Sequence, residues 1–210
     1  MTPTVACAAT TGAGVILFLV AEARRSRGLA WIGKPIASTG FVALACLSGA
    51  TGSRHGIGIL IALVLSWLGD LLLIPESTFL AGLGSFLLAH ISFAASFALR
   101  GMDRMAAAAA LTALALPAAI VWRWLSPHLP PAFRVPVAAY VVAITAMVAA
   151  AVATTWSRPA APLILGVVAF YFSDISVARD RFVAPGLRNR LWGVPLYYGA
   201  QLLIAVSVSC

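Results

Sequence analysis

Acidic side chains are nearly absent from this sequence. Only 6 of its 210 residues are aspartate or glutamate, and charged residues of all kinds make up 10% of the chain. Hydrophobic residues account for 62%, and the mean hydropathy is +1.00. So few charges cannot cover a water-facing surface, and apolar runs of about 18 residues or more, long enough to span a bilayer, recur along the whole chain. The sequence therefore predicts a polytopic membrane protein.

Cysteine is scarce as well. Cys7, Cys46 and Cys210 are isolated, and no C-x-x-C motif or Cys/His cluster includes them. This spacing gives no sign of a zinc site or a disulfide framework, so we expect all three to be small apolar core residues. The motifs G-x-S-x-G, H-E-x-x-H and the P-loop are also missing, which disfavours a serine hydrolase, a zincin and an ATPase.

The apolar runs predict an all-α bundle of eight transmembrane helices in a single integral-membrane domain, residues 1–210. Unbroken runs of this length favour helices over barrel strands, which would show about ten residues of strict alternation. The first run lacks the cleavage site and the preceding basic residues of a signal peptide, so we interpret it as a mature helix. The predicted helices lie at about 5–22, 35–52, 56–74, 79–99, 105–125, 134–155, 159–178 and 190–209.

Basic residues give the chain a net charge of +8, but they lie between the apolar runs and not on a soluble face that could bind nucleic acid. Ten of the 14 lie in or beside the connections after the first, third, fifth and seventh helices, and four beside the other connections. The positive-inside rule then places both termini outside and the ten-residue side in the cytoplasm. The excess of arginine over lysine suggests a bacterial source, so we expect the bacterial inner membrane.

Two of the six acids fall inside predicted helices. Asp70 is the 15th residue of the run that begins at Gly56, and Asp174 is the 16th of the run that begins at Pro159. Both helices run toward the cytoplasm, so the two carboxyls should reach a similar depth in the same leaflet. A carboxyl in hydrocarbon costs a few kcal/mol at least and usually faces a bundle interior or a wet cavity. The alternative is a structural carboxyl that bonds another helix or reaches water at the interface.

Similar sequences surround the two aspartates. G-D-L-L-L-I-P-E-S-T-F starts at Gly69, and S-D-I-S-V-A-R-D-R-F starts at Ser173. Each has a small residue, an aspartate, a short apolar stretch and a phenylalanine. This likeness suggests a possible 4+4 parallel internal repeat.

Other polar residues fall at compatible depths. His90 lies near the middle of the fourth helix, where it is either a satisfied core donor or part of a site. Tyr198 and Gln201 share a face of the eighth helix, and the glutamine needs partners that lipid cannot supply. We expect Lys34 to open the second helix at the cytoplasmic surface, where it could be a snorkelling anchor or contact a phosphate.

Several motifs, taken in order, resemble the YhhN family of membrane lysoplasmalogenases. They are GDLLL at 69–73, FLAGLGSFLLAH at 79–90, F-x-x-S-D at 170–174 with a phenylalanine eight residues on, and YYGAQLLIA at 197–205. The likeness extends from Lys34 and Pro35 to the eighth helix. It implies hydrolysis of the sn-1 vinyl ether of a lysoplasmalogen, or of a related ether lysolipid, to a fatty aldehyde and a glycerophospho-alcohol.

The resemblance also implies roles for particular residues. Asp70 and Asp174 would be the catalytic pair, with their carboxyls roughly 4 to 9 Å apart, as in other paired-carboxyl chemistry. Burial and mutual repulsion would keep one protonated while the other stays ionised, which provides both an acid and an anion. No metal or organic cofactor would be needed. The residues that would bind or orient the substrate are Lys34, His90, Tyr140, Ser173, Tyr198 and Gln201.

Two readings from other classes stay open. Intramembrane acids and a histidine could also form the proton relay of a small proton-coupled transporter. A transporter should place ionisable groups along a path across the membrane, whereas both aspartates are expected near one leaflet. The third reading is a structural membrane protein without chemistry.

Overall fold

The computed structural model of the protein describes residues 2–209, and this range folds into eight long helices without a strand. All eight are long and apolar enough to cross a membrane. A π-helical turn, Arg179–Val183, follows the seventh helix, and short 3₁₀ turns lie in other connections. The helices are α1 (Pro3–Ala23), α2 (Arg27–Leu47), α3 (Arg54–Leu72), α4 (Phe79–Leu99), α5 (Arg104–Leu125), α6 (Pro131–Ser157), α7 (Ala161–Ala178) and α8 (Leu187–Val206).

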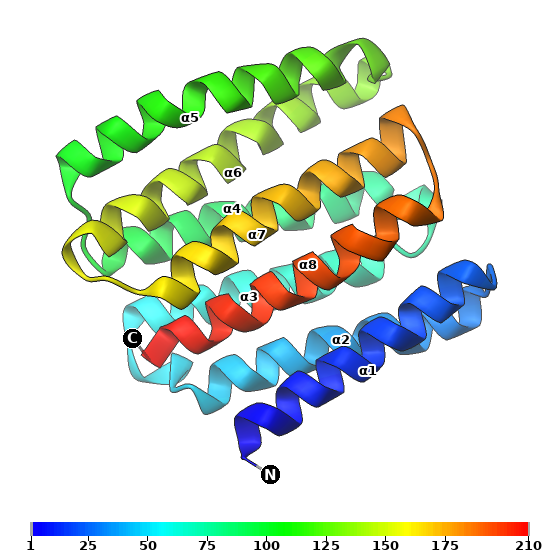
Figure 1. Ribbon diagram of the computed structural model, residues 1–210, viewed down its shortest axis with the longest axis horizontal. Coiled ribbons are helices and arrows are strands. Elements are labelled where there is room, and N and C mark those ends of the chain that lie inside the picture. The colour runs from blue at the N-terminus through cyan, green and yellow to red at the C-terminus, as the bar shows by residue number, and fades with distance from the viewer. Residues whose placement is uncertain (1, 210) are drawn as a thin grey trace.

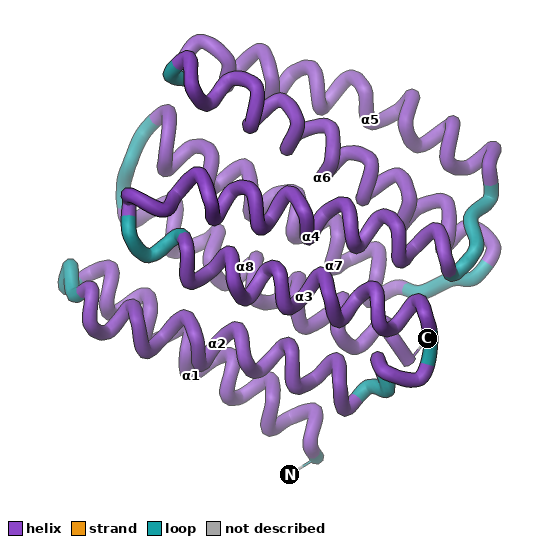
Figure 2. The backbone as a smooth tube through the Cα atoms, turned by 180° about the vertical axis from the view of Figure 1, so that it is seen from behind, coloured by secondary structure: helices purple, strands orange, loops and turns teal. Residues whose placement is uncertain are grey.

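The helices form two layers that run side by side (Figures 1 and 2). One layer contains α5, α7, α8 and α1, and the other contains α6, α4, α3 and α2. The connections α1–α2, α3–α4, α5–α6 and α7–α8 gather at one end of the bundle (Figure 1). The layers place the C-terminal parts of α3 and α7, which carry the two aspartates, toward this same end.

The predicted helix boundaries agree with the structure to within three residues, except in the second helix. That helix was expected over 35–52, but it begins at Arg27 and ends at Leu47. The Ser26 hydroxyl accepts a hydrogen bond from the Leu29 amide and caps the start of α2. Pro35 therefore lies inside α2, where a membrane bundle tolerates the missing hydrogen bond.

Glycine permits the close contact between α1 and α2. A Cβ on Gly14 would lie 2.4 Å from the Ala37 nitrogen, and one on Gly33 would lie 2.7 Å from the Phe18 nitrogen. Because both obstacles are backbone atoms, neither could move aside cheaply. Close backbone approach through small residues is the common basis of helix packing in membranes.

The apolar core includes an aromatic face of α4 and departs from expectation at one cysteine. The face of α4 that carries His90 also carries Phe86, Phe93 and Phe97, and all four side chains are buried. Cys7 is half-buried and packs against the core, whereas Cys46 is exposed and is not the core residue that was expected. Cys210 lies outside the described residues. In a bilayer an exposed small thiol costs little, since lipid is as apolar as a core.

Candidate active site

Asp70 lies in the last turn of α3 and receives hydrogen bonds from two other helices. The Ser38 hydroxyl of α2 donates to Asp70 Oδ2 at 2.6 Å, and the Tyr197 hydroxyl of α8 donates to the same oxygen at 2.9 Å. Tyr198 lies 3.4 Å from the Ser38 hydroxyl, measured between oxygens. The Asp70 side chain is only 5% exposed. Three helices therefore enclose this carboxyl among hydroxyl groups.

Lys34 lies inside this cluster, which corrects the expectation that it opens α2 at the cytoplasmic surface. Its ammonium donates a hydrogen bond to the Asp70 backbone carbonyl at 3.1 Å and lies 3.8 Å from Asp70 Oδ1. It also lies 5.1 Å from the ring centre of Phe18 in α1. Because α2 begins at Arg27, Lys34 is two turns inside the helix and faces α3. The charged group nearest to the Lys34 ammonium is therefore the Asp70 carboxylate.

Asp174 has a second, separate set of partners. The Tyr140 hydroxyl of α6 donates to Asp174 Oδ2 at 2.8 Å. His90 Nε2 of α4 lies 3.4 Å from the same oxygen. The Asp174 side chain is 17% exposed, whereas the imidazole of His90 is fully buried. Asp174 is thus the more accessible of the two aspartates.

The contact made by Nδ1, the other ring nitrogen of His90, shows which nitrogen carries the hydrogen of a neutral ring. His90 Nδ1 lies 2.6 Å from the backbone carbonyl oxygen of Phe86. A carbonyl oxygen can only accept, so Nδ1 must carry the hydrogen of this bond. In a neutral imidazole the second nitrogen is then an acceptor. Nε2 lies 3.4 Å from Asp174 Oδ2 but makes no hydrogen bond of ordinary geometry with residues 2–209, so a neutral ring keeps an acceptor free beside this carboxyl.

Aromatic rings connect the two clusters. The ring centre of Phe170 lies 4.8 Å from that of His90 and 5.4 Å from that of Tyr197. The ring of Phe86 lies 5.8 Å from Tyr197 and 6.4 Å from Phe170. Tyr197, which contacts Asp70, and His90, which lies beside Asp174, therefore both pack against Phe170. The expected spacing of roughly 4 to 9 Å between the carboxyls stays a prediction.

The partner helices follow a regular scheme. Asp70 of α3 is held by α2 and α8, whereas Asp174 of α7 is held by α6 and α4. If α1–α4 corresponds to α5–α8, these two sets are equivalent. The scheme is what a 4+4 parallel repeat would produce, and the repeat itself stays a prediction.

The remaining expected site residues divide into two groups. Gln201 is fully buried one turn after Tyr197, and its amide makes no hydrogen bond of ordinary geometry with residues 2–209. Ser173 instead donates to the Phe170 carbonyl of its own helix at 2.7 Å, so its hydroxyl is not directed at a carboxyl. Tyr198 contacts Asp70 less closely than Tyr197 does. The Ser173 hydroxyl has therefore used its one donor hydrogen, whereas the Gln201 amide keeps donors and an acceptor for a further partner.

Sequence reasoning did not select Ser38 or Tyr197 as site residues. Ser38 lies one helical turn after Lys34 and so shares its face, a signal that the assumed helix start at Pro35 concealed. Tyr197 directly precedes Tyr198, and which of two adjacent tyrosines faces α3 depends on the rotation of α8. The described residues contain no group of three His, Cys, Asp or Glu side chains that could hold a metal ion.

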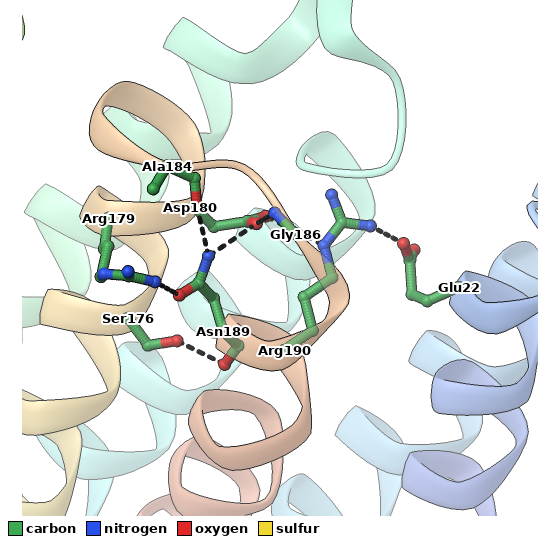
Figure 3. A network of polar contacts seen from close by, with 8 residues as sticks. All are labelled: Glu22, Ser176, Arg179, Asp180, Ala184, Gly186, Asn189 and Arg190. Atoms are coloured by element: carbon green, nitrogen blue, oxygen red, sulfur yellow. Dashed lines mark hydrogen bonds and ion pairs between the residues drawn. The ribbon is translucent and has the colours of Figure 1, made fainter.

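A polar network closes the same end of the bundle (Figure 3). Asp180 in the π-helical turn accepts hydrogen bonds from the Gly186 amide at 2.8 Å and the Asn189 side chain at 3.2 Å. Arg190 of α8 pairs with both Asp180 and Glu22 of α1. The network therefore ties α1 to the α7–α8 connection, so that α1, α7 and α8 are fixed relative to one another beside the two clusters.

The chain is similar to known proteins over most of its length. The model of the YhhN family matches residues 29–208. A lysoplasmalogenase of Mycobacterium bovis is 36% identical over 187 residues, which cover 78% of this chain and 67% of the relative. Human lysoplasmalogenase TMEM86A is 32% identical over 73% of this chain and 70% of the relative. Pig lysoplasmalogenase TMEM86B is 31% identical over 70% of this chain and 62% of the relative. No solved structure matches.

Proposed function

We propose that this chain, which belongs to the YhhN family, hydrolyses the vinyl ether bond of a lysoplasmalogen or a related ether lysolipid. The products would be a fatty aldehyde and a glycerophospho-alcohol. Relatives named lysoplasmalogenase at 31% to 36% identity support the reaction class. The observation that carries the mechanism is the contrast between the two aspartates, one beside a lysine and the other beside an acceptor nitrogen.

The reaction needs an acid and an anion. A proton added to the outer vinyl carbon leaves an oxocarbenium ion at the carbon bonded to oxygen. Water attacks that carbon and loses one proton, which restores the proton donor. The hemiacetal then collapses to the aldehyde, and its carbon–oxygen bond breaks to free the glycerol hydroxyl. Glycosidases use two carboxyls for a similar oxocarbenium-like state.

Asp174 is suited to donate the proton. With Nδ1–H of His90 bonded to a carbonyl, Nε2 of a neutral His90 can accept a hydrogen bond from a protonated Asp174, whose Oδ2 lies 3.4 Å away. The alternative, an imidazolium beside a carboxylate, places two charges in an apolar interior and costs more desolvation free energy. Asp174 is also the more exposed of the two carboxyls, so a substrate can approach it.

Asp70 is suited to remain an anion. Burial of Asp70 disfavours a charge there, and two hydroxyl hydrogen bonds together with the nearby ammonium of Lys34 oppose that cost and favour the charged form. A fixed carboxylate stabilises a developing cation most effectively in a site without bulk water. Gln201, whose amide makes no hydrogen bond of ordinary geometry with residues 2–209, would hold the attacking water near Tyr197.

A substrate series tests the proposal. Purified protein should release fatty aldehyde from lysoplasmenylethanolamine, no fatty acid from the ester analogue and nothing from the saturated alkyl ether analogue. The saturated ether is inert because it has no double bond to protonate. Fatty acid released from the ester would indicate a lysophospholipase instead. The absence of any product would favour the transporter alternative, which proton flux in vesicles would then test.

We also propose an orientation in the bacterial inner membrane. Both termini would lie outside, and the end with the polar network would face the cytoplasm. In a cysteine-free background, Pro185→Cys should resist a membrane-impermeant maleimide in intact cells, whereas Thr51→Cys, exposed at the opposite end, should react. After permeabilisation both should react. Labelling of Pro185→Cys in intact cells would reverse the orientation.

A further inference from the structure

An open groove lies on the outer surface of the bundle between α4 and α6, with the end of α5 beside it. Its volume is about 750 Å³. Volumes of about 300 to 1,000 Å³ are typical of pockets that hold one small ligand. Its wall is apolar apart from one cation. The lining residues are Leu87, Ile91, Trp122, Arg134, Val135, Ala138, Ala139, Val142, Ala143 and Ala146.

That cation, Arg134, is exposed in the first turns of α6. It makes no ion pair or hydrogen bond with any residue in 2–209. It belongs to the end of the bundle where the α5–α6 connection lies, together with Trp122 from the last turn of α5. A free guanidinium matches a phosphate in charge and in hydrogen-bonding geometry. Tryptophan is typical of the membrane interface, where lipid headgroups lie.

The groove is about as long as one leaflet is deep. From Arg134 to Ala146 the helix rises by ~18 Å, at 1.5 Å per residue. The hydrocarbon half-thickness of a bilayer is ~15 Å. One charge at the mouth and an apolar channel of this length fit an amphiphile with one phosphate and one chain.

The depth of the groove also matches the site. Tyr140 lies six residues beyond Arg134 on α6, a rise of ~9 Å, which is similar to the extended distance from the phosphorus of a lysoplasmalogen to its vinyl ether carbons. On α4, the groove residues Leu87 and Ile91 flank His90. A phosphate on Arg134 would therefore bring the ether bond of a bound lysolipid to the level of the Asp174 cluster.

We propose that this groove binds a lysophospholipid, with its phosphate on Arg134 and its single chain between α4 and α6. The inference rests on the proposed function for the identity of the ligand as substrate. It assigns the phosphate contact to Arg134, in place of Lys34, whose ammonium is already directed at Asp70.

Photo-crosslinking tests the groove without turnover. The probe is a saturated alkyl ether lysophosphocholine with a diazirine in its chain, added to the purified protein in bilayer nanodiscs. Labelled peptides should come from the groove faces of α4 and α6, and unlabelled lysophosphocholine should compete. Arg134→Gln should weaken probe binding about tenfold or more, as expected for a lost charge-assisted contact, and Arg134→Lys should retain most of it.

Two matched substitutions separate the groove from general lipid contact. Ala139→Phe fills the groove and should abolish the labelling, whereas Ala115→Phe, on an exposed face of α5 outside the groove, should leave it unchanged. Equal labelling of α1 and α5, or no effect of Arg134→Gln in monodisperse protein, would overturn the inference. Specific labelling without vinyl ether hydrolysis would instead contradict the proposed function and leave the groove in place.

Discussion

Asp174→Asn is expected to lower the turnover of a vinyl ether lysolipid by about 100-fold to 10,000-fold, the usual contribution of a general acid. The substitution is nearly ideal for this position. The amide oxygen can still accept from Tyr140, and the amide NH₂ can donate to His90 Nε2 as a protonated carboxyl would. The variant therefore keeps the hydrogen bonds of the neutral acid and loses only the transferable proton.

The measurement is aldehyde release under saturating substrate, with monodispersity and thermal stability checked in the same preparation. Asp103→Asn provides the matched control, because Asp103 caps α5 through the Ala106 amide and asparagine is an equally good cap. Infrared spectra add a readout independent of turnover, since the carbonyl band of a protonated carboxyl should be lost from Asp174→Asn and retained in Asp70→Asn. Activity of Asp174→Asn within about fivefold of the parent would make Asp174 a structural residue.

Lys34→Met should destabilise the folded protein by about 3 to 5 kcal/mol, the cost of leaving a buried charge without its partner. The loss follows from geometry, because the Lys34 ammonium is the cation beside Asp70 and both side chains are buried. The double variant Lys34→Met with Asp70→Asn should recover most of the stability but not the activity, since the anion is absent. Both results would be read from denaturation in detergent and from aldehyde release.

Arg27→Gln is the control for Lys34→Met, because Arg27 is an exposed cation at the start of the same helix. It should melt like the parent, as surface charges contribute little. If Lys34→Met instead kept the stability of the parent and raised KM for phosphate-bearing substrates alone, Lys34 would be a phosphate contact and not a buried partner of Asp70.

The sequence by itself determined that the protein lies in a membrane, how many helices it has, and which two acids lie inside those helices. Apolar runs of bilayer length leave few alternatives, so most helix boundaries agree with the structure to within three residues. Asp70 and Asp174 stand out because a carboxyl inside such a run is costly and therefore rare. The ordered motifs around them were enough to indicate the family before any contact was known.

The tertiary structure decided which side chains meet. In a soluble helix the polar face reveals the rotation, but here lipid and core are equally apolar, so sequence periodicity does not say which face points inward. Tyr197 contacts Asp70 across 127 positions of sequence, more closely than the adjacent Tyr198 does, and no local pattern encodes that choice. Likewise, α2 starts eight residues before Pro35, so Lys34 lies inside the helix. The packing of α2 against α3 then brings the Lys34 ammonium to Asp70. The packing of helices far apart in sequence, and not the hydropathy of any one of them, sets the chemistry of each aspartate.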